Sequence, residues 1–258
     1  MAINAKPILL YDNRFNDGTL TATDTASGYD VLNIKDLRTY TFWKAASAGT
    51  KHITVYCGSS KSADALGIVG HNLFSANATV SVEYSATGAW AGEELVALAG
   101  FTPSDDKAFL KIFTSQSARY WRIKIVTASV AAYLAVLILG VKLTFERFLQ
   151  AEFDPTPEKI ESESKKSKTG NLLGSTVNFI SRTIKASWKY LTPSWIDSTF
   201  KPAWDNHLSQ LKPFFWAWDI TNHSNEIFFV KISDDFSLSM PYDPIRRNLT
   251  LEMEGVKE

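Results

Sequence analysis

The sequence has almost no cysteine and no excess charge of either sign. Cys57 is the single cysteine among 258 residues, so an internal disulfide is excluded and a reducing compartment is favoured. Cys57 ends the alternating run 53–57, which predicts a thiol on a strand rather than a nucleophile. The 27 Lys and Arg residues balance 27 Asp and Glu residues. A neutral chain lacks the basic excess that neutralises phosphates, so no nucleic-acid partner is expected.

Long apolar runs are missing as well. The longest, residues 128–141, is interrupted by Ser129 and Gly140. It is shorter than the about 20 residues that a membrane-spanning helix needs. The first six residues contain no apolar core, so no secretory signal is expected. Together these absences predict a protein that does not insert into a membrane.

The familiar catalytic and cofactor motifs are also absent. There is no Gly-x-Ser-x-Gly elbow, no Gly-x-x-x-x-Gly-Lys-Ser/Thr loop and no Gly-x-Gly-x-x-Gly fingerprint. None of the four histidines has a second His or Cys at ligand spacing, so no zinc site is expected. We predict that the chain is not an enzyme and uses no cofactor. A polysaccharide-degrading enzyme remains an alternative, because catalytic groups can converge in space from distant positions.

Three pairs of neighbouring carboxylates were considered as acid/base pairs. They are Glu93 with Glu94, Asp105 with Asp106, and Asp234 with Asp235. Neighbours along a strand point to opposite faces, so none of these pairs forms an acid/base site by itself.

What the sequence does have is apolar and aromatic residues in quantities that can fill a core. In the first 150 residues, short runs typical of strands alternate with clusters of turn residues. These runs are residues 51–56, 65–69, 79–84, 108–113, 120–126 and 133–145. Only Pro7 and Pro103 occur in this part, so the strands are uninterrupted. The pattern predicts a mainly β fold with a jelly-roll-type sandwich over residues 1–150.

The composition changes sharply after the predicted sandwich. Pro155 and Pro157 lead into a mixed-charge, Ser-rich run at residues 158–168. Such a composition is typical of a linker or an exposed loop, and we expect one at residues 151–169.

Residues 170–258 predict a β-rich domain in which a strand is followed by one helix and three further strands. Residues 178–190 alternate over a long strand, and Thr192 followed by Pro193 favours a helix start. Pro202 is expected to kink or divide that helix. Three further strands are expected at residues 212–218, 226–232 and 248–253.

Tryptophan is concentrated in this second part. The aromatic residues considered are Trp188, Trp195, Trp204, Phe215, Trp216 and Trp218. One interpretation is the compact core of a small domain whose helix packs on its sheet. The other is a subunit interface or an aromatic platform for sugars, since Trp is enriched at such surfaces. The sequence leaves both open.

One loop motif, His71 with Asn72 after Gly70, could suggest a sugar or metal site. We instead expect Gly70 to supply an unusual backbone angle, and His71 and Asn72 to form hydrogen bonds with the loop backbone.

Residues 66–73 and 76–85 resemble the discoidin-type, galactose-binding-like sandwich found in bacteriophage tail proteins. The Trp-containing loop at 41–45 and the strands at 119–123 and 140–147 extend the resemblance to about residues 10–147. It implies a sandwich that can bind sugars through loops at one end. Tyr40, Trp43 and Trp90 are then the candidates for stacking on a glycan.

The second part resembles phage tail-tip proteins of the distal tail or minor tail class. The matching pieces are residues 170–175, the strand-to-helix unit ending at Trp204, and residues 212–218 and 246–256. In that family this half is a small β-barrel-like domain that packs into a ring at the end of the tail tube, so the resemblance implies a small β-barrel-like domain with one α-helix at residues 170–258.

The two resemblances imply a structural component of a phage or prophage tail tip. It would form a ring of six copies, join the tail tube protein to the tail-tip hub proteins and display the sandwich outward. It would be made in the bacterial host cytoplasm and reside in the virion tail tip. The alternative is a carbohydrate-binding module that attaches to a host-surface glycan. A structural ring can carry adhesin domains, so the two hypotheses are compatible.

Overall fold

The chain folds into two compact units. The computed structural model describes residues 5–150, 153–233, 237–240 and 245–257. Leu9–Leu143 form one unit, here called the sandwich unit. Met1–Ile8 and Thr144–Glu258 form the other, here called the hairpin unit. The described residues include no helix long and apolar enough to cross a membrane.

The unit boundaries differ from the predicted ranges, because the sandwich unit is an insertion. The chain passes into it at β1 (Ile8–Leu10) and out of it at β9 (Leu143–Thr144), and these two strands are neighbours in one sheet. Residues 1–8 and 144–150 were predicted to belong to the sandwich but cluster with the hairpin unit. Pairing between sequence-distant strands determines this division, and composition does not reveal it.

The sandwich unit is built from antiparallel strands and two 3₁₀-helical turns. Its elements are η1 (Arg14–Asn16), β2 (Thr19–Ala22), η2 (Val31–Lys35), β3 (Trp43–Lys44), β4 (Gly49–His71), β5 (Thr79–Ser85), β6 (Leu95–Phe101), β7 (Phe109–Thr127) and β8 (Tyr133–Gly140). The strands pair in the order β3-β8-β4-β7-β5-β6, and β2 pairs with β4.

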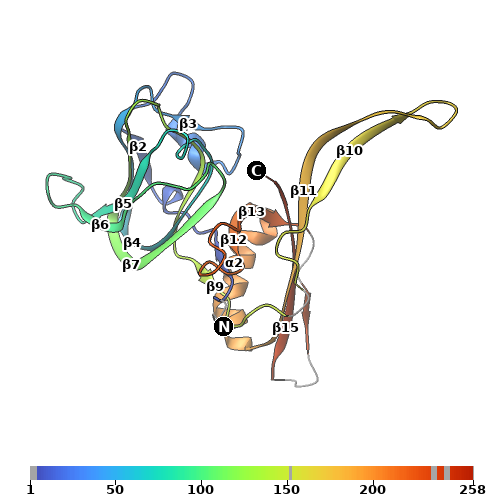
Figure 1. The fold of residues 1–258 in the computed structure, drawn as a ribbon. Coiled ribbons are helices and arrows are strands. Elements are labelled where there is room, and N and C mark those ends of the chain that lie inside the picture. The colour runs from blue at the N-terminus through green and yellow to red at the C-terminus, as the bar shows by residue number, and fades with distance from the viewer. Residues whose placement is uncertain (1–4, 151–152, 234–236, 241–244, 258) are drawn as a thin grey trace. The chain divides into compact units, whose positions relative to one another are not determined.

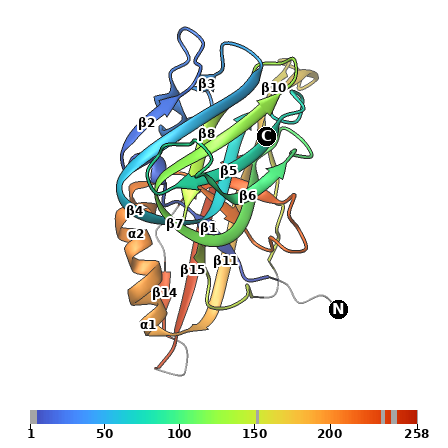
Figure 2. The same cartoon turned by 90° about the vertical axis from the view of Figure 1, so that its left-hand side faces the viewer.

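Two long strands take part in both layers of the sandwich. β4 and β7 pair from Gly49 opposite Thr127 to Ile68 opposite Phe109, and Figure 2 shows both as long curved ribbons. The β4–β7 register shifts between Tyr56 and Lys61, and such irregularities bend strands. β2 and β5 pair with one end of this ribbon and β8 with the other. Four of the six predicted runs therefore merge into two strands, β4 and β7, while residues 79–84 correspond to β5 and residues 133–145 divide into β8 and β9.

Alternation along these strands fills the space between the layers. On β4, Ile53 and Val55 are buried, while Thr54 between them is half-buried. On β7, Ile123 is buried as well. Cys57 continues the inward set on β4, as predicted, and burial raises the pKa of its thiol to about 11. The thiol is therefore protonated at neutral pH and is a poor nucleophile.

The hairpin unit combines a twisted sheet with one helical segment. Its elements after β9 are β10 (Lys159–Lys166), β11 (Leu172–Leu191), α1 (Pro193–Trp195), the π-helical turn η3 (Ile196–Phe200), α2 (Lys201–Asn206), the 3₁₀ turn η4 (Leu208–Gln210), β12 (Phe214–Ala217), β13 (Ile227–Ile232), β14 (Ser237–Ser239) and β15 (Arg247–Val256). The sheet order is β10-β11-β15-β13-β12-β1-β9, with β14 on β15.

The helix starts where the sequence predicts. Thr192 is its N-cap, its side chain accepts a hydrogen bond from the Trp195 N–H, and Pro193 occupies the first turn. A wide turn follows in which the Lys201 N–H bonds to the Ile196 carbonyl, directly before Pro202. Proline lacks an N–H and crowds the carbonyl four residues earlier, and a π-type turn accommodates both effects.

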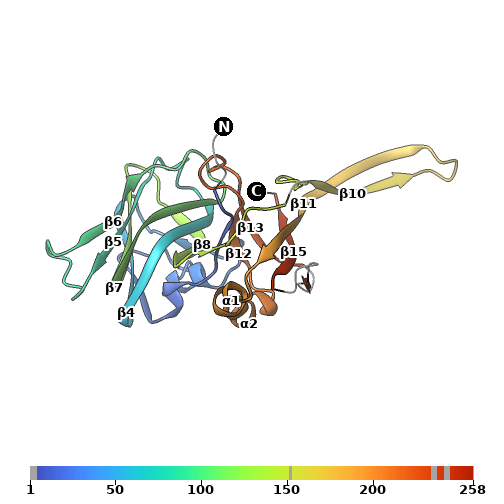
Figure 3. The ribbon, with the colours of Figure 1, turned by 90° about the horizontal axis from the view of Figure 1, so that it is seen from below.

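The segment predicted as a linker or exposed loop at residues 151–169 contains a strand. β10 pairs with the first part of β11, from Lys159 opposite Ser181 to Lys166 opposite Leu172. The two strands form a long hairpin that projects from the rest of the hairpin unit (Figures 1 and 3). At its tip Gly170 has a φ of 86°. The prediction was wrong because charged residues and serines hide the alternation of β10.

Candidate functional site

Three aromatic side chains lie in contact at the edge of the sandwich unit where β3 begins. The rings of Tyr29 and Phe42 stack at a centroid distance of 4.9 Å and an angle of 26°. Phe42 also contacts Tyr133, with ring centroids 5.1 Å apart. The ammonium group of Lys44 lies 5.7 Å from the centre of the Tyr29 ring. We call Tyr29, Phe42 and Tyr133 the aromatic row.

Backbone hydrogen bonds hold the aromatic row in place. The Ala26 N–H donates to the Lys44 carbonyl at 2.8 Å, which ties the Tyr29 loop to β3. The Asn33 side-chain amide donates to the Phe42 carbonyl at 3.1 Å. Lys44 stands opposite Tyr133 in the β3–β8 pairing. The row is therefore set before any ligand arrives, which reduces the ordering that binding requires.

Tyr40 lies two residues before Phe42 and is 75% exposed. Its loop is fixed by Asp36, whose carboxylate accepts hydrogen bonds from the Thr41 hydroxyl at 2.6 Å and the Arg38 N–H at 2.9 Å. An open aromatic ring on a fixed loop presents a flat apolar face to a ligand, with its own hydroxyl as a polar group. Of the three predicted stacking residues, Tyr40 is the one whose ring is open to a ligand.

The prediction that Trp43 stacks on a ligand is wrong. Its side chain is 0% exposed in the core of the sandwich. The indole N–H donates to the Asp24 carbonyl at 3.2 Å and to the Thr25 hydroxyl at 3.1 Å. Adjacent strand residues point to opposite faces, so burying Trp43 turns Phe42 and Lys44 outward. Phe42 was not among the predicted stacking residues, although strand alternation predicts that it faces outward if Trp43 is buried.

Trp90 is half-buried in the loop between β5 and β6. The Arg122 guanidinium lies 4.1 Å from the centre of its ring, so one ring face is occupied. Arg122 in turn donates from Nε to a Glu83 carboxylate oxygen at 2.5 Å. The loop is closed by Glu93, which accepts hydrogen bonds from Ser85 and Ala89 and whose pKa is lowered to about 2 by such bonds, the Ser85 bond first. Trp90 therefore serves mainly as a cover over a buried ion pair.

His71 and Asn72 hydrogen-bond with the loop backbone, as predicted. The Leu73 N–H lies 3.2 Å from His71 Nδ1, so Nε2 carries the proton and donates to the Lys107 carbonyl at 2.9 Å. The side-chain Oδ1 of Asn72 accepts from the Tyr133 N–H at 2.8 Å, which positions one end of the aromatic row. Burial lowers the pKa of His71.

The predicted aromatics of the hairpin unit separate into an interior group and a partly exposed group. Trp188, Phe215 and Trp216 are completely buried within the chain. Trp188 stacks on Phe145 at 3.9 Å with nearly parallel rings, and the Trp216 ring stands edge-on to Trp188 at 5.9 Å. Trp195, Trp204 and Trp218 are half-buried. Only the second group offers surface to a partner.

No metal centre emerges from the described residues, where no cluster of three or more His, Cys, Asp or Glu side chains could hold an ion. Glu93 and Glu94 sit in the Trp90 loop and make hydrogen bonds there. Asp106 accepts from the Phe74 N–H at 2.8 Å. Asp234 and Asp235 lie outside the described residues.

No family model matches this sequence, and no curated protein matches it. Several solved structures resemble part of the chain. A chitosan-binding module from a chitosanase/glucanase of Paenibacillus sp. IK-5 has 18% identity and a TM-score of 0.43, covering 50% of this chain and 98% of that one. A CBM32 module from Clostridium perfringens, solved with GalNAc-β-1,3-galactose, has 14% identity and a TM-score of 0.42 over 50% and 99%. The CBM32 module of AlyQ, solved with 4,5-unsaturated mannuronic acid, has 19% identity and a TM-score of 0.40 over 54% and 98%. At these values the similarities carry no inference about a ligand.

Proposed function

We propose that the sandwich unit is a carbohydrate-binding module that attaches the protein to a host-surface glycan. The observation that carries this proposal is the aromatic row with the exposed Tyr40 beside it in the chain. A pyranose ring has an apolar face of C–H groups and a polar rim. The exposed ring of Tyr40 matches the apolar face, and polar groups nearby, such as the Lys44 ammonium over the Tyr29 ring, match the rim. No catalytic role is assigned to any residue.

The test is glycan binding by the intact chain and by single variants. Tyr40→Ala and Tyr29→Ala are expected to weaken binding to the preferred host polysaccharide about tenfold or more, as removal of a central aromatic anchor does. Tyr56→Ala is the matched control, because Tyr56 belongs to a different stacked pair, with Tyr120, in the same unit. Glycan arrays followed by affinity electrophoresis measure the effect. Failure to bind any polysaccharide of the host surface contradicts the proposal.

A second candidate function is a structural role in a phage or prophage tail tip. In this role residues 170–258 form a ring of six copies between the tail tube and hub proteins, and the sandwich unit is displayed outward. The observation that favours it is the projecting β10–β11 hairpin, whose two faces differ in charge. Lys159, Glu161 and Glu163 alternate along β10, and Lys159 pairs with Glu161 at 2.8 Å on one face.

The opposite face of the hairpin carries no charge over most of its length. Ile160 stands opposite Ile180, Ser162 opposite Val177, and Ser164 opposite a further serine. Cross-strand partners share a face, and Ile160 and Val177 are exposed in the single chain. Such a face gains free energy when a second copy covers it, and an open edge strand favours the same kind of contact.

Neighbouring residues on opposite faces of the hairpin allow a sharp test. Val177→Lys places a charge on the uncharged face and is expected to abolish the association of copies. Thr176→Lys places the same charge on the charged face and is expected to leave association intact. Mass measurement and imaging of tail particles provide the readout. A protein that stays monomeric at all concentrations and never enters tail particles contradicts this role.

A further inference from the structure

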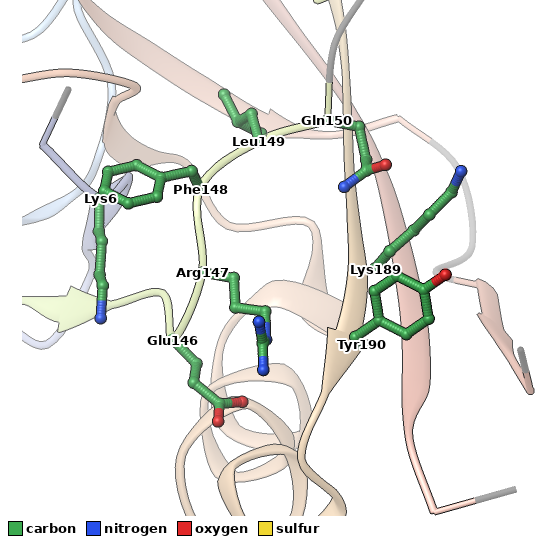
Figure 4. A pocket seen from close by; sticks show the side chains of 8 residues that line it. All are labelled: Lys6, Glu146, Arg147, Phe148, Leu149, Gln150, Lys189 and Tyr190. Carbon is green, nitrogen blue, oxygen red and sulfur yellow. The ribbon is translucent and has the colours of Figure 1, made fainter. Parts of the chain in front are cut away.

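A groove with a volume of about 620 Å³ opens in the hairpin unit, between residues 146–150 and the end of β11 (Figure 4). Ligand sites for small molecules typically measure about 300–1,000 Å³, so the groove has room for a ring-sized ligand. Phe148 and Tyr190 line it and are 43% and 50% exposed. The groove therefore offers aromatic surface to whatever enters it.

Three cationic side chains line the same groove, those of Lys6, Arg147 and Lys189. Within the part of the chain that the structure describes, none of the three forms an ion pair or a side-chain hydrogen bond. The one acid of the lining, Glu146, is turned to the helix start. Its carboxylate accepts from the Thr192 N–H at 2.8 Å and from the Thr192 hydroxyl at 3.1 Å. The positive charge of the groove is thus left for a ligand.

The backbone of β11 is irregular at this place. Its pairing with β15 passes from Trp188 opposite Leu249 to Leu191 opposite Arg247, so Lys189 and Tyr190 have no partner in the register. Tyr190 has a φ of 61°, in the left-handed region that a tyrosine seldom adopts. A bulge redirects side chains, and strained residues of this kind concentrate at binding sites. Lys189 and Tyr190 both line the groove, and Figure 4 shows their side chains extending to the same side of β11.

We propose that this groove binds an acidic glycan, a short run of uronic acid residues. The sugar carboxylates pair with Arg147, Lys189 and Lys6, because charge-assisted hydrogen bonds between such groups are the strong ones. The apolar faces of the pyranose rings lie against Phe148 and Tyr190. An acidic peptide backbone has no pyranose rings whose apolar faces could lie against these aromatic side chains. A single-stranded nucleic acid needs a longer basic track with several stacking aromatics, which this groove does not provide. The site lies in the other unit from the aromatic row and does not depend on the function proposed for that row.

Titration of the intact chain with trigalacturonic acid, by calorimetry, tests the proposal. Its fully methyl-esterified form keeps the three rings and removes the charge, and we expect it to bind at least tenfold more weakly. Binding of the acid should also weaken as salt rises. Arg147→Ala and Lys189→Ala should each reduce affinity about tenfold. Tyr190→Ala should reduce affinity for the acid without changing its salt dependence. Lys185→Ala is the matched control, since Lys185 is an exposed lysine on β11 that does not line the groove.

Four outcomes overturn the proposal. The first is that the acid does not bind the folded chain, and the second is that the ester binds equally well. The third is that Lys185→Ala weakens binding as much as Lys189→Ala does, which indicates general attraction. The fourth is that an oligoglutamate or a single-stranded oligonucleotide binds the groove more tightly than the uronate. Tyr40→Ala separates the two proposals, because it should weaken glycan binding at the aromatic row and leave uronate binding at the groove unchanged.

Discussion

The sandwich unit and the hairpin unit use strand alternation in different ways. In the sandwich, the inward residues of β4 and β7 are covered by the opposite layer, as for Ile53 and Ile123. In β11 this holds only for the second half, where Ile184 and Trp188 are buried, while Val177 in the first half is exposed. The same periodicity thus produces a buried core in one case and an exposed apolar residue in the other. Alternation predicts a strand, but it does not predict what covers the strand.

The two cores also differ in how they treat buried tryptophan. In the sandwich the indole N–H of Trp43 donates to the Asp24 carbonyl and that of Trp121 to the Lys61 carbonyl. In the hairpin unit the indole N–H groups of Trp188 and Trp216 are buried and have no hydrogen-bond partner among the described residues. An unsatisfied buried donor costs about 1–3 kcal/mol. The hairpin unit is therefore expected to be the less stable of the two.

The largest expected effect is on stability, and it contrasts a glycine packed against another backbone segment with a glycine that has open space around it. A Cβ added at Gly140, in the sandwich unit, would lie 1.7 Å from the Asp12 carbonyl oxygen, whereas one added at Gly174, in β11, would meet no atom within 4 Å. Gly140→Ala is expected to lower the free energy of unfolding of the sandwich by more than about 3 kcal/mol. Gly174→Ala is expected to change stability by less than about 1 kcal/mol. Denaturant unfolding measures both, and equal effects would contradict this contrast.

The next effect tests the comparison of the cores. Trp121→Phe removes the hydrogen bond to the Lys61 carbonyl, while Trp188→Phe removes a donor that has no partner among the described residues. A phenylalanine at position 188 can still stack on Phe145. Trp121→Phe is therefore expected to destabilise its unit by about 1–3 kcal/mol more than Trp188→Phe destabilises its own. Calorimetric scans that resolve the two units provide the measurement. A larger loss of stability for Trp188→Phe than for Trp121→Phe would contradict this comparison of the two cores.

The smallest expected effect is a pH dependence of the sandwich. Burial lowers the pKa of His71 below its ordinary value of about 6.5 in the unfolded chain. The unfolded state then binds the proton first, so the stability due to neutral His71 is fully present above that value. It is lost progressively as the pH falls below it. His71→Gln should flatten the profile between pH 7.5 and pH 5, as measured by urea unfolding. If the free energy of unfolding of that variant depends on pH as steeply as before, His71 is not the source of the pH dependence.

Much of this fold follows from the sequence, and the failures have specific causes. The mainly β class, the Thr192–Pro193 helix start and the long strand before it are local properties of the chain. β10 was missed because its side chains are charged or hydroxylated, so no apolar period marks it. Trp43 rather than Phe42 was predicted to lie at the surface, because tryptophan is enriched at binding surfaces. Only one of two neighbouring strand residues can face outward, and Trp43 is the buried one.

The groove could not have been predicted, because its parts are distant in sequence. Lys6, Arg147 and Lys189 come from three separate segments, and only the folded hairpin unit places them around one space. The backbone irregularity at Tyr190 depends on pairing with β15 and leaves no mark in composition. Sites of this kind become visible only when the register of the sheet is known.

The adjacency of β1 and β9 has a consequence for the order in which the protein forms during synthesis. β1 leaves the ribosome first, but its sheet neighbour β12 follows about 200 residues later. Pairings between such distant segments are slow, because a long loop must be closed. All strands of the sandwich lie between β1 and β9, so that unit can fold before the hairpin unit is complete. Its folding then holds β1 and β9 together, and the late strands meet a template that is already assembled.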